Sequence, residues 1–295
     1  MEIKLLSVIV PIYKNEKTIK KNLIELNDIL KDTQYNYEII GVVDGIENDH
    51  SYEYARSIIN PYLNIIGYRK NRGKGLAVRY GMLKARGDVI IFIDSGGDIN
   101  PGGIRMLLEH MKWYDADIVV GSKLHPASKV NNYPLFKTKI YYIINKVLFR
   151  LKIRDTQTGL KAYKREVLEH VLGKMLIKRF AFDIELLAVA KHLGFYKIYD
   201  APVEINYDVA NSTYFKTSFY KEAFNVLYDT LSVWYRIFIL GYYDNDKQRE
   251  SYFDEELGIK INTGNLYNEK QNIIDMVNKY SKYLHIFSND RLRKK

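Results

Sequence analysis

The chain has 295 residues, of which 47% are hydrophobic and 27% are charged; this composition excludes a disordered protein and fits one large domain with an appended segment. It contains no cysteine, which excludes disulfides and thiolate metal sites and fits a reducing, cytoplasmic location. Its formal net charge of +10 favours a polyanionic partner, for which nucleic acid, an anionic membrane surface and a phosphorylated substrate are the candidates.

Short apolar runs alternate with amphipathic stretches over the first hundred residues. The first run, SVIVPIY, is too short for a secretory signal peptide, and the runs YEIIGVV, LNIIGY and VIIFID follow it in order. Between them the apolar spacing predicts helices over 16–30, 51–59 and 75–86. Runs that are apolar throughout are typical of strands covered on both faces by crossover helices. The sequence therefore predicts an α/β fold with a mostly parallel sheet flanked by helices.

Carboxylates follow three of these runs at the point where each run ends. The first run continues into the loop 11–16, the second ends at Asp44, and the fourth ends at Asp94, with Asp98 four residues later. Because ligands of such sheets bind at the carboxyl ends of the strands, these acids mark a candidate site. A single aspartate at a strand end is more often a helix cap, and capping of the helix after Pro101 remains the alternative for Asp98.

A glycine-rich segment, NRGKGLAVRYG, follows the third run and opens a predicted helix. It resembles the G-x-G-x-x-G dinucleotide fingerprint, but Val78 stands at the sixth position and the segment follows the third strand rather than the first. A nicotinamide cofactor is therefore disfavoured. The glycines still let backbone amides approach a ligand closely, and Lys74 adds a cation beside them.

Seven segments of the chain, taken in order, carry a family resemblance. They are SVIVPIYKNE, VVDG, NRGKGLAVRYGM, FIDSGGDINP, DIVVGSK, RDTQTGLKAYKREVL and RFAFDIELLAVAKHLGFYKIYDAPVEINY. Over residues 5–207 the chain resembles family 2 glycosyltransferases of the dolichol-phosphate mannosyltransferase type. The resemblance implies a GT-A fold, a nucleotide-sugar-binding α/β architecture. It also implies inverting transfer of a mannose- or glucose-type hexose from a GDP- or UDP-sugar to a polyprenyl (dolichyl) phosphate.

The resemblance also implies a donor site at the strand ends. By position it assigns donor binding to Pro11, Tyr13, Glu16, Asp44, Lys74, Asp94 and Ser95. Asp94 begins the counterpart of a DxD motif and, with Asp98, would hold Mg²⁺ or Mn²⁺ on the donor diphosphate, because hard oxygen ligands suit these ions. The chain departs from the family pattern where Gly96 replaces the middle acid of that motif. It departs again where Gly45 and Glu47 replace two residues of the VDDGS motif.

Two lysines, Lys123 and Lys137, stand where the family places basic residues that bind the acceptor phosphate. Lysine binds phosphate as a point charge, and a phosphate oxygen is nucleophilic near neutral pH, so no strong general base is needed. Asp155 matches a recurrent family acid and joins Asp94 and Asp98 as a candidate catalytic residue. A structural role remains the alternative for Asp155 and for a second family acid, Glu185.

Two segments have the pattern of helices that lie in a membrane interface. Residues 135–152 carry an apolar face and a separate basic face. The apolar face comprises Ile140, Ile144, Val147, Leu148 and Leu151, and the basic face comprises Lys139, Lys146 and Arg150. Residues 221–243 repeat the theme, but Asp229 and Arg236 interrupt it, so a transmembrane span is not expected. We expect a peripheral protein at the inner, cytoplasmic face of an anionic membrane.

The predicted organisation is a catalytic domain over 1–212, an amphipathic helix over 213–243 and a polar, basic tail of unassigned role over 244–295. Two other functions remain open. One is transfer to a protein, lipid or polysaccharide hydroxyl, which would make a base such as Asp155 essential. The other is a nucleotide-sugar-binding pseudoenzyme, which the altered DxD motif permits. A nucleic-acid binder is disfavoured because the aromatic residues do not interleave with the basic ones.

Overall fold

The computed structural model describes residues 2–207, 219–244 and 250–263, apart from the side chains of residues 137 and 219–224. Residues 213–218 of the predicted amphipathic helix, and most of the predicted tail, therefore lie outside the described residues. The predicted domain boundaries stay a prediction.

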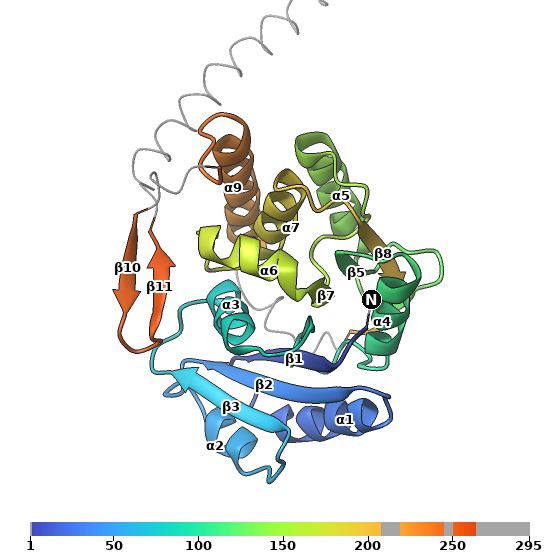
Figure 1. The fold of residues 1–295 in the computed structure, drawn as a ribbon, viewed down its shortest axis with the longest axis vertical. Helices are drawn as coiled ribbons and strands as arrows, with labels where there is room; N and C mark the ends of the chain where they lie inside the picture. Colours follow the sequence, from blue (N-terminus) through green and yellow to red (C-terminus); the bar gives the residue numbers. More distant parts are fainter. Residues whose placement is uncertain (1, 208–218, 245–249, 264–295) are drawn as a thin grey trace, which may run out of the picture.

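A seven-stranded sheet forms the centre of the molecule, in the order β3-β2-β1-β4-β7-β5-β8 (Figure 1). Its strands are β1 (Leu5–Ile12), β2 (Asn36–Asp44), β3 (Leu63–Tyr68), β4 (Val89–Ile93), β5 (Ile118–Ser122), β7 (Leu160–Lys164) and β8 (Ile198–Pro202). Neighbouring strands pair in parallel, except that β7 runs antiparallel to both β4 and β5. The predicted α/β class with a mostly parallel sheet is confirmed.

Helices flank this sheet, as the sequence predicts. They are α1 (Ile19–Lys31), α2 (Ser51–Arg56), α3 (Lys74–Lys84), α4 (Gly103–Trp113), α5 (Leu135–Phe149), α6 (Arg165–Val171), α7 (Phe182–His192) and α9 (Phe219–Phe238), with a 3₁₀ turn η1 (Leu172–Lys174). The predicted helix over 16–30 begins three residues later, at Ile19, after a turn in which the Asn15 carbonyl accepts the amides of Thr18 and Ile19. Within the described residues, no helix combines the length and apolar character needed to cross a bilayer.

Two short strand pairs lie apart from the main sheet. One joins β6 (Lys129–Asn131) to β9 (Glu204–Asn206) in parallel. The other is an antiparallel hairpin of β10 (Ser251–Asp254) and β11 (Ile259–Asn262), which falls in the segment treated above as a polar tail. Its signal in the sequence is the alternation in IKIN beyond Gly258, which adopts a φ of +63° in the turn.

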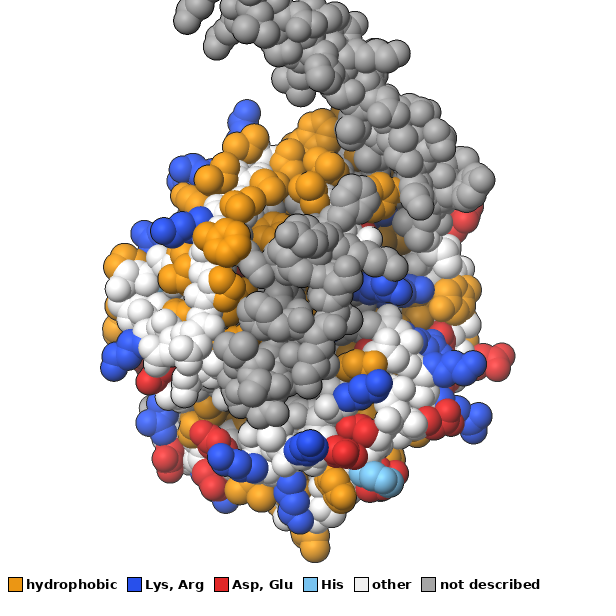
Figure 2. Space-filling model, turned by 180° about the vertical axis from the view of Figure 1, so that it is seen from behind, with side chains coloured by type: hydrophobic (Ala, Val, Ile, Leu, Met, Phe, Trp, Pro, Cys, Tyr) orange, Lys and Arg blue, Asp and Glu red, His pale blue; other side chains and the backbone are white. Residues whose placement is uncertain are grey.

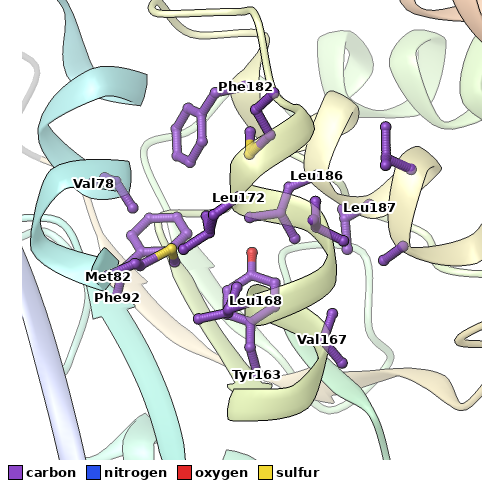
Figure 3. Close-up of a cluster of buried hydrophobic side chains, with 14 of the residues drawn as sticks. Val78, Met82, Phe92, Tyr163, Val167, Leu168, Leu172, Phe182, Leu186 and Leu187 are labelled. Atoms are coloured by element: carbon purple, nitrogen blue, oxygen red, sulfur yellow. The ribbon is translucent and has the colours of Figure 1, made fainter. Parts of the chain in front are cut away.

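Strand β4 is buried on both faces, which explains its unbroken apolar sequence. Ile90 and Phe92 belong to the hydrophobic cluster on the α3 and α7 side, whereas Val89, Ile91 and Ile93 belong to the cluster on the α1 and α4 side. Figure 3 shows part of the first cluster, in which the labelled Phe92 lies among side chains of α3, α6 and α7. Complete burial of a side chain of this size contributes about 1.5–3 kcal/mol.

One edge of the sheet gathers the segments that carry the candidate site. Strands β1, β2, β4 and β5 end there because they run in the same direction. The antiparallel β7 begins at that edge, since Leu160 pairs with Ile93. The loops that follow β4 and β5 therefore meet the loop that precedes β7.

Candidate active site

A cavity of about 250 Å³ lies at this edge. Its polar wall includes Lys74, Asp94, Asp98, Lys123, Thr158 and Asp183, and its apolar wall includes Tyr133, Phe180, Ile205, Tyr207 and Val226. Residues 74, 94, 98 and 123 were all named from the sequence, and the structure brings them into the wall of one cavity. Ser95, also named, lines a second cavity of about 200 Å³ that adjoins the first at Asp94 and Asp98.

Lys74 and Asp94 form an ion pair inside the first cavity. The Lys74 ammonium lies 2.6 Å from Oδ1 of Asp94 and 2.9 Å from Oδ2. Burial alone would lower the pKa of Lys74, but the carboxylates of Asp94 and Asp183 raise it above its ordinary value, so the ammonium keeps its proton. The cavity therefore holds a permanent cation beside the carboxylate that ends β4.

Gly159 makes room for this carboxylate. Its carbonyl accepts the Asp94 amide at 2.9 Å, and a Cβ at position 159 would lie only 1.9 Å from Oδ2 of Asp94. A side chain at residue 159 would force Asp94 to move. Gly159 was not singled out from the sequence, because its partner is distant along the chain.

The loop after β4 is held by amide side chains. The carbonyl of Ser95 accepts hydrogen bonds from Asn15 Nδ2 at 2.6 Å and from Asn22 Nδ2 at 2.7 Å. Helix α4 begins at Gly103, and the amide of Gly102 before it donates to Oδ1 of Asn100 at 2.9 Å. Both roles considered for Asp98, metal ligand and helix cap, stay predictions.

Asp94 and Asp98 are suitable ligands for a metal shared with a phosphate. Among the residues that the structure describes, no three His, Cys, Asp or Glu side chains group as a metal cage. Mg²⁺ commonly takes only one or two carboxylates from a protein and completes its shell with substrate phosphates and water. Asp94 and Asp98 both line the cavity, so these two carboxylates suit Mg²⁺ or Mn²⁺ when a diphosphate supplies the other oxygen ligands.

Lys123 and Asp155 form a second ion pair, at the end of β5. The Lys123 ammonium lies 2.8 Å from Oδ2 of Asp155 and 3.0 Å from Oγ1 of Thr158. The amides of Lys123 and Gln157 also donate to the Asp155 carboxylate, each at 3.0 Å. Asp155 is only 1% exposed. The pair thus fixes the loop before β7 against the end of β5.

The protonation state of Asp155 follows from these contacts. Burial would raise its pKa, but the charge of Lys123 and the hydrogen bonds together lower it below its ordinary value. A carboxylate that holds protons this weakly is a poor general base near neutral pH. The structure therefore gives Asp155 a positioning role behind Lys123, and its predicted catalytic role stays a prediction.

Lys137, the other candidate for the acceptor phosphate, belongs to the first turn of α5. Its side chain lies outside the described part of the chain, so its predicted role stays a prediction.

The remaining donor residues lie further along the same edge, outside the cavity. The Asp44 carboxylate accepts the amides of Arg72 at 2.6 Å and Gly73 at 2.9 Å, and the side-chain amide of Asn71 at 2.9 Å. It therefore organises the loop between β3 and α3. The donor-binding role predicted for Asp44 stays a prediction.

The loop 11–16 is shorter than predicted, because Pro11 is buried within β1 and pairs with Val42. Tyr13 is 43% exposed just beyond the strand. Glu16 accepts the amide of His50 at 3.2 Å, which ties the loop to the start of α2. Binding of the donor by Pro11, Tyr13 and Glu16 stays a prediction.

A buried pair of charges below the cavity was missed by the sequence analysis. Lys161 in β7 is 0% exposed, and its ammonium lies 2.6 Å from Oδ1 of Asp183, in the first turn of α7. Burial raises the pKa of Asp183, and the lysines Lys161 and Lys74 only partly oppose it. The available signal was a lysine on the core side of a short strand, LKAYK, which demands a buried counter-ion.

Glu185, two residues after Asp183 in α7, supports the loop that carries Phe180. Its carboxylate accepts the amides of Leu176 at 2.9 Å and Ile177 at 2.8 Å, and the hydroxyl of Tyr243 at 2.8 Å. Of the two roles considered for it, the contacts support the structural one.

An exposed apolar strip runs along α5. Phe136, Ile140, Ile143 and Val147 are each at least half exposed. This corrects the predicted face, because Leu151 is buried and Ile143 takes part instead. Phe238 and Ile239 at the end of α9 are also exposed. Figure 2 shows hydrophobic side chains gathered at the end of the molecule that holds α5 and α9, with lysine and arginine around them.

The sequence matches both a family model and individual proteins of known name. Residues 7–172 match the model of glycosyl transferase family 2. The dolichyl-phosphate beta-glucosyltransferase of Homo sapiens is 30% identical over 221 residues, 69% of this chain and 67% of that protein. A protein of the same name from Trichomonas vaginalis is 32% identical over 68% of this chain and 65% of its own length. The chain thus spans about two thirds of the length of these relatives.

Two further matches cover less of the sequence or have lower sequence identity. The dolichol-phosphate mannosyltransferase of Pyrococcus furiosus is 30% identical over 56% of this chain and 47% of its own length. Among solved structures, glucosyl-3-phosphoglycerate synthase from Mycobacterium tuberculosis, in complex with Mn²⁺, UDP and glucosyl-3-phosphoglycerate, has a TM-score of 0.57 at 16% identity, over 88% of each chain. The same enzyme has been solved with Mg²⁺ and UDP. At this identity the likeness concerns the fold, which the two proteins share.

Proposed function

The chain belongs to glycosyl transferase family 2, and from this premise we propose that it transfers a hexose from a nucleoside diphosphate sugar to a polyprenyl (dolichyl) phosphate, with inversion at the sugar. One observation carries the proposal: a single cavity is lined by both the Lys74–Asp94 pair and Lys123. These groups are proposed to bind the donor diphosphate and the acceptor phosphate. The names of the relatives, which act on dolichyl phosphate, support it and favour glucose as the hexose.

The charge balance of the cavity supports a divalent cation on the donor. Three lysines and four aspartates lie in or directly behind its wall, which leaves one net negative charge before any ligand binds. They are Lys74, Lys123, Lys161, Asp94, Asp98, Asp155 and Asp183. A diphosphate adds further negative charge, so Asp94 and Asp98 would hold Mg²⁺ or Mn²⁺ against it. The metal, when bound, stabilises the leaving diphosphate.

The acceptor is proposed to be its own nucleophile. A phosphate oxygen attacks the anomeric carbon, a new bond forms from that carbon to the phosphate, and the bond to the nucleoside diphosphate breaks with its electrons. Lys123 has three N–H donors, of which Asp155 and Thr158 accept two, and the third is assigned to the acceptor phosphate. The lowered pKa of Asp155 favours this scheme, because no proton has to be removed.

A second candidate acceptor is a hydroxyl group. Asp183 lines the cavity, and burial raises its pKa, which brings that carboxyl closer to the range of a general base. A hydroxyl acceptor would need such a base, whereas a phosphate acceptor would not.

A lipid acceptor would require the enzyme to act at a membrane. The exposed strip of α5, together with the exposed end of α9, is proposed to lie in the interface, with Lys139 and Lys146 toward anionic headgroups. Attachment is then peripheral, and the cytoplasmic inner face is the proposed location.

Transfer is tested with labelled UDP-glucose and GDP-mannose against polyprenyl phosphate and the matching polyprenol, with Mg²⁺ or Mn²⁺. We expect label in the lipid extract only with the phosphate acceptor, and none in Asp94→Asn. Transfer to polyprenol would select the hydroxyl scheme and Asp183. Nucleotide-sugar binding without transfer to either lipid would identify a pseudoenzyme.

A further inference from the structure

We propose that the β10–β11 hairpin is a clamp that positions Lys74 for the donor, acting through Arg72. The proposal rests on the proposed function, because it concerns how the chain holds the nucleoside diphosphate. The hairpin lies beyond the residues matched by the family model, so its role is not part of that match.

The hairpin is docked on the body of the protein. Leu257 and Ile261 are buried in the cluster that also contains side chains of α3 and α7. The side chain of Asn262 donates to the carbonyl of Gly173 at 2.6 Å, and Arg79 of α3 donates to the carbonyl of Lys260 at 3.4 Å. Apolar and polar contacts thus fix the position of its turn.

The turn of the hairpin, residues 254–258, is acidic, and it contacts the basic loop of residues 69–74 between β3 and α3. The guanidinium of Arg72 pairs with the carboxylates of both Asp254 and Glu256, the latter at 2.5 Å. The other oxygen of Glu256 accepts the amide of Arg69 at 2.8 Å. Asp254 is buried, and its pKa is lowered because Arg72 and backbone amides outweigh the effect of burial. Arginine binds two carboxylates with a fixed geometry, which lysine does not.

The basic loop is therefore gripped from two sides. From inside, Asp44 accepts the amides of Arg72 and Gly73. From outside, the hairpin holds the Arg72 side chain. Gly73 has a φ of +104°, a backbone conformation that favours glycine. A Cβ there would lie 2.5 Å from the carbonyl oxygen of Lys178, so a side chain at this position would force the loop to move. The next residue is Lys74, whose ammonium reaches Asp94.

The clamp has a physical purpose in a donor site. Lys74 lies beside Asp94 in the wall of the cavity, and a loop that is ordered before the ligand arrives does not have to be ordered by it. The acidic turn also keeps Arg72 directed away from the cavity, so that Lys74 is the cation presented to the phosphates. Arg72, Asp254 and Glu256 are thus positioning residues for donor binding.

The test compares Asp254→Asn/Glu256→Gln with the matched control Glu255→Gln, a neutralised and exposed acid of the same turn. The affinity for UDP and GDP is measured by calorimetry with Mn²⁺, together with hydrogen exchange at the amides of residues 72 and 73. We expect the double variant to bind its nucleotide about tenfold more weakly, as for lost charge-assisted hydrogen bonds. We also expect a raised donor KM, faster exchange, a kcat within about twofold and an unchanged acceptor KM. The control should match the wild type.

A second variant, Arg72→Lys, keeps the charge without the fork and should give an intermediate loss of nucleotide affinity. Unchanged or tighter nucleotide binding in the double variant would overturn the clamp, as would equal losses of donor and acceptor affinity, which a general loss of structure produces. Absence of nucleotide binding in the wild type would overturn it too. A wild type that binds nucleotide but transfers no sugar to lipid would overturn the proposed function alone, since the binding experiment still decides the clamp.

Discussion

Lys74 contacts both carboxylate oxygens of Asp94, at 2.6 and 2.9 Å, so a metal ion that binds Asp94 must share or displace this lysine. We expect Lys74→Met to bind Mn²⁺ more tightly than the wild type without nucleotide, and to bind nucleoside diphosphate more weakly. Asp94→Asn should bind nucleotide equally with Mn²⁺ and with chelator. Calorimetric titrations of each variant measure both effects. If the wild type bound nucleotide with the same affinity in Mn²⁺ and in chelator, the proposed metal at the donor site would be contradicted.

Gly159 provides a steric test of the same carboxylate. Because a Cβ at this position would lie 1.9 Å from Oδ2 of Asp94, Gly159→Ala should displace Asp94 and lower nucleotide affinity at least about tenfold. Gly173→Ala is the matched control, since its Cβ would meet nothing within 4 Å. Nucleotide titrations and thermal unfolding distinguish a local effect from a general one. Equal behaviour of the two variants would contradict the prediction.

Lys123 must be tested together with its partner, because removing one charge of a buried pair exposes the other to an apolar environment. Lys123→Met alone should lower the free energy of unfolding by about 3–5 kcal/mol. Lys123→Met/Asp155→Asn should recover much of that stability, while its KM for polyprenyl phosphate stays at least about tenfold raised. Denaturant unfolding and steady-state kinetics supply the two measurements. Recovery of the acceptor KM in the double variant would reduce Lys123 to a structural role.

The exposed apolar strip on α5 predicts that this helix contributes to vesicle binding. Ile143→Asp/Val147→Asp should weaken sedimentation with anionic vesicles about tenfold or more, because both side chains are more than half exposed on the proposed interface. Ile59→Asp is the control, a fully exposed isoleucine between α2 and β3. Higher salt should also weaken binding, since screening shortens electrostatic attraction to about 10 Å at 0.1 M. Wild-type binding that resists both salt and the α5 substitutions would contradict the assignment.

Asp200 predicts a pH dependence of stability. Burial raises its pKa from 3.8 to about 6, against the opposing amide of Arg154. The folded state then binds the proton more tightly, so this group's stabilising contribution is complete below pH 3.8 and is lost as pH rises through about 6. Asp200→Asn should gain stability over the wild type by up to about 3 kcal/mol between pH 4 and pH 7.5. Urea unfolding at both pH values measures this, and a constant difference would refute it.

Much of the fold could be predicted from local pattern, because strands covered on both faces, such as β4, leave an unbroken apolar run. The direction of β7 could not be predicted, because the sequence LKAYK contains no signal for strand direction. Its antiparallel direction is seen only from the pairing of Leu160 with Ile93. Candidate acids and lysines were found at strand ends, but their partners are 20 to 35 residues away in sequence. Which charges neutralise one another therefore required the structure.

The position of β7 divides the sheet into two groups of strands. β1 to β4 pair only among themselves and with β7, while β5 and β8 pair with each other, and β5 with β7. The strand ends that carry Asp44 and Asp94 thus belong to one group, and the one that carries Lys123 to the other. Under the proposed function, substitutions in the β5 and β8 group would alter the acceptor side of the pocket while the first group keeps its register. On that proposal, acceptor choice could change between relatives without disturbing the strands that carry the donor residues.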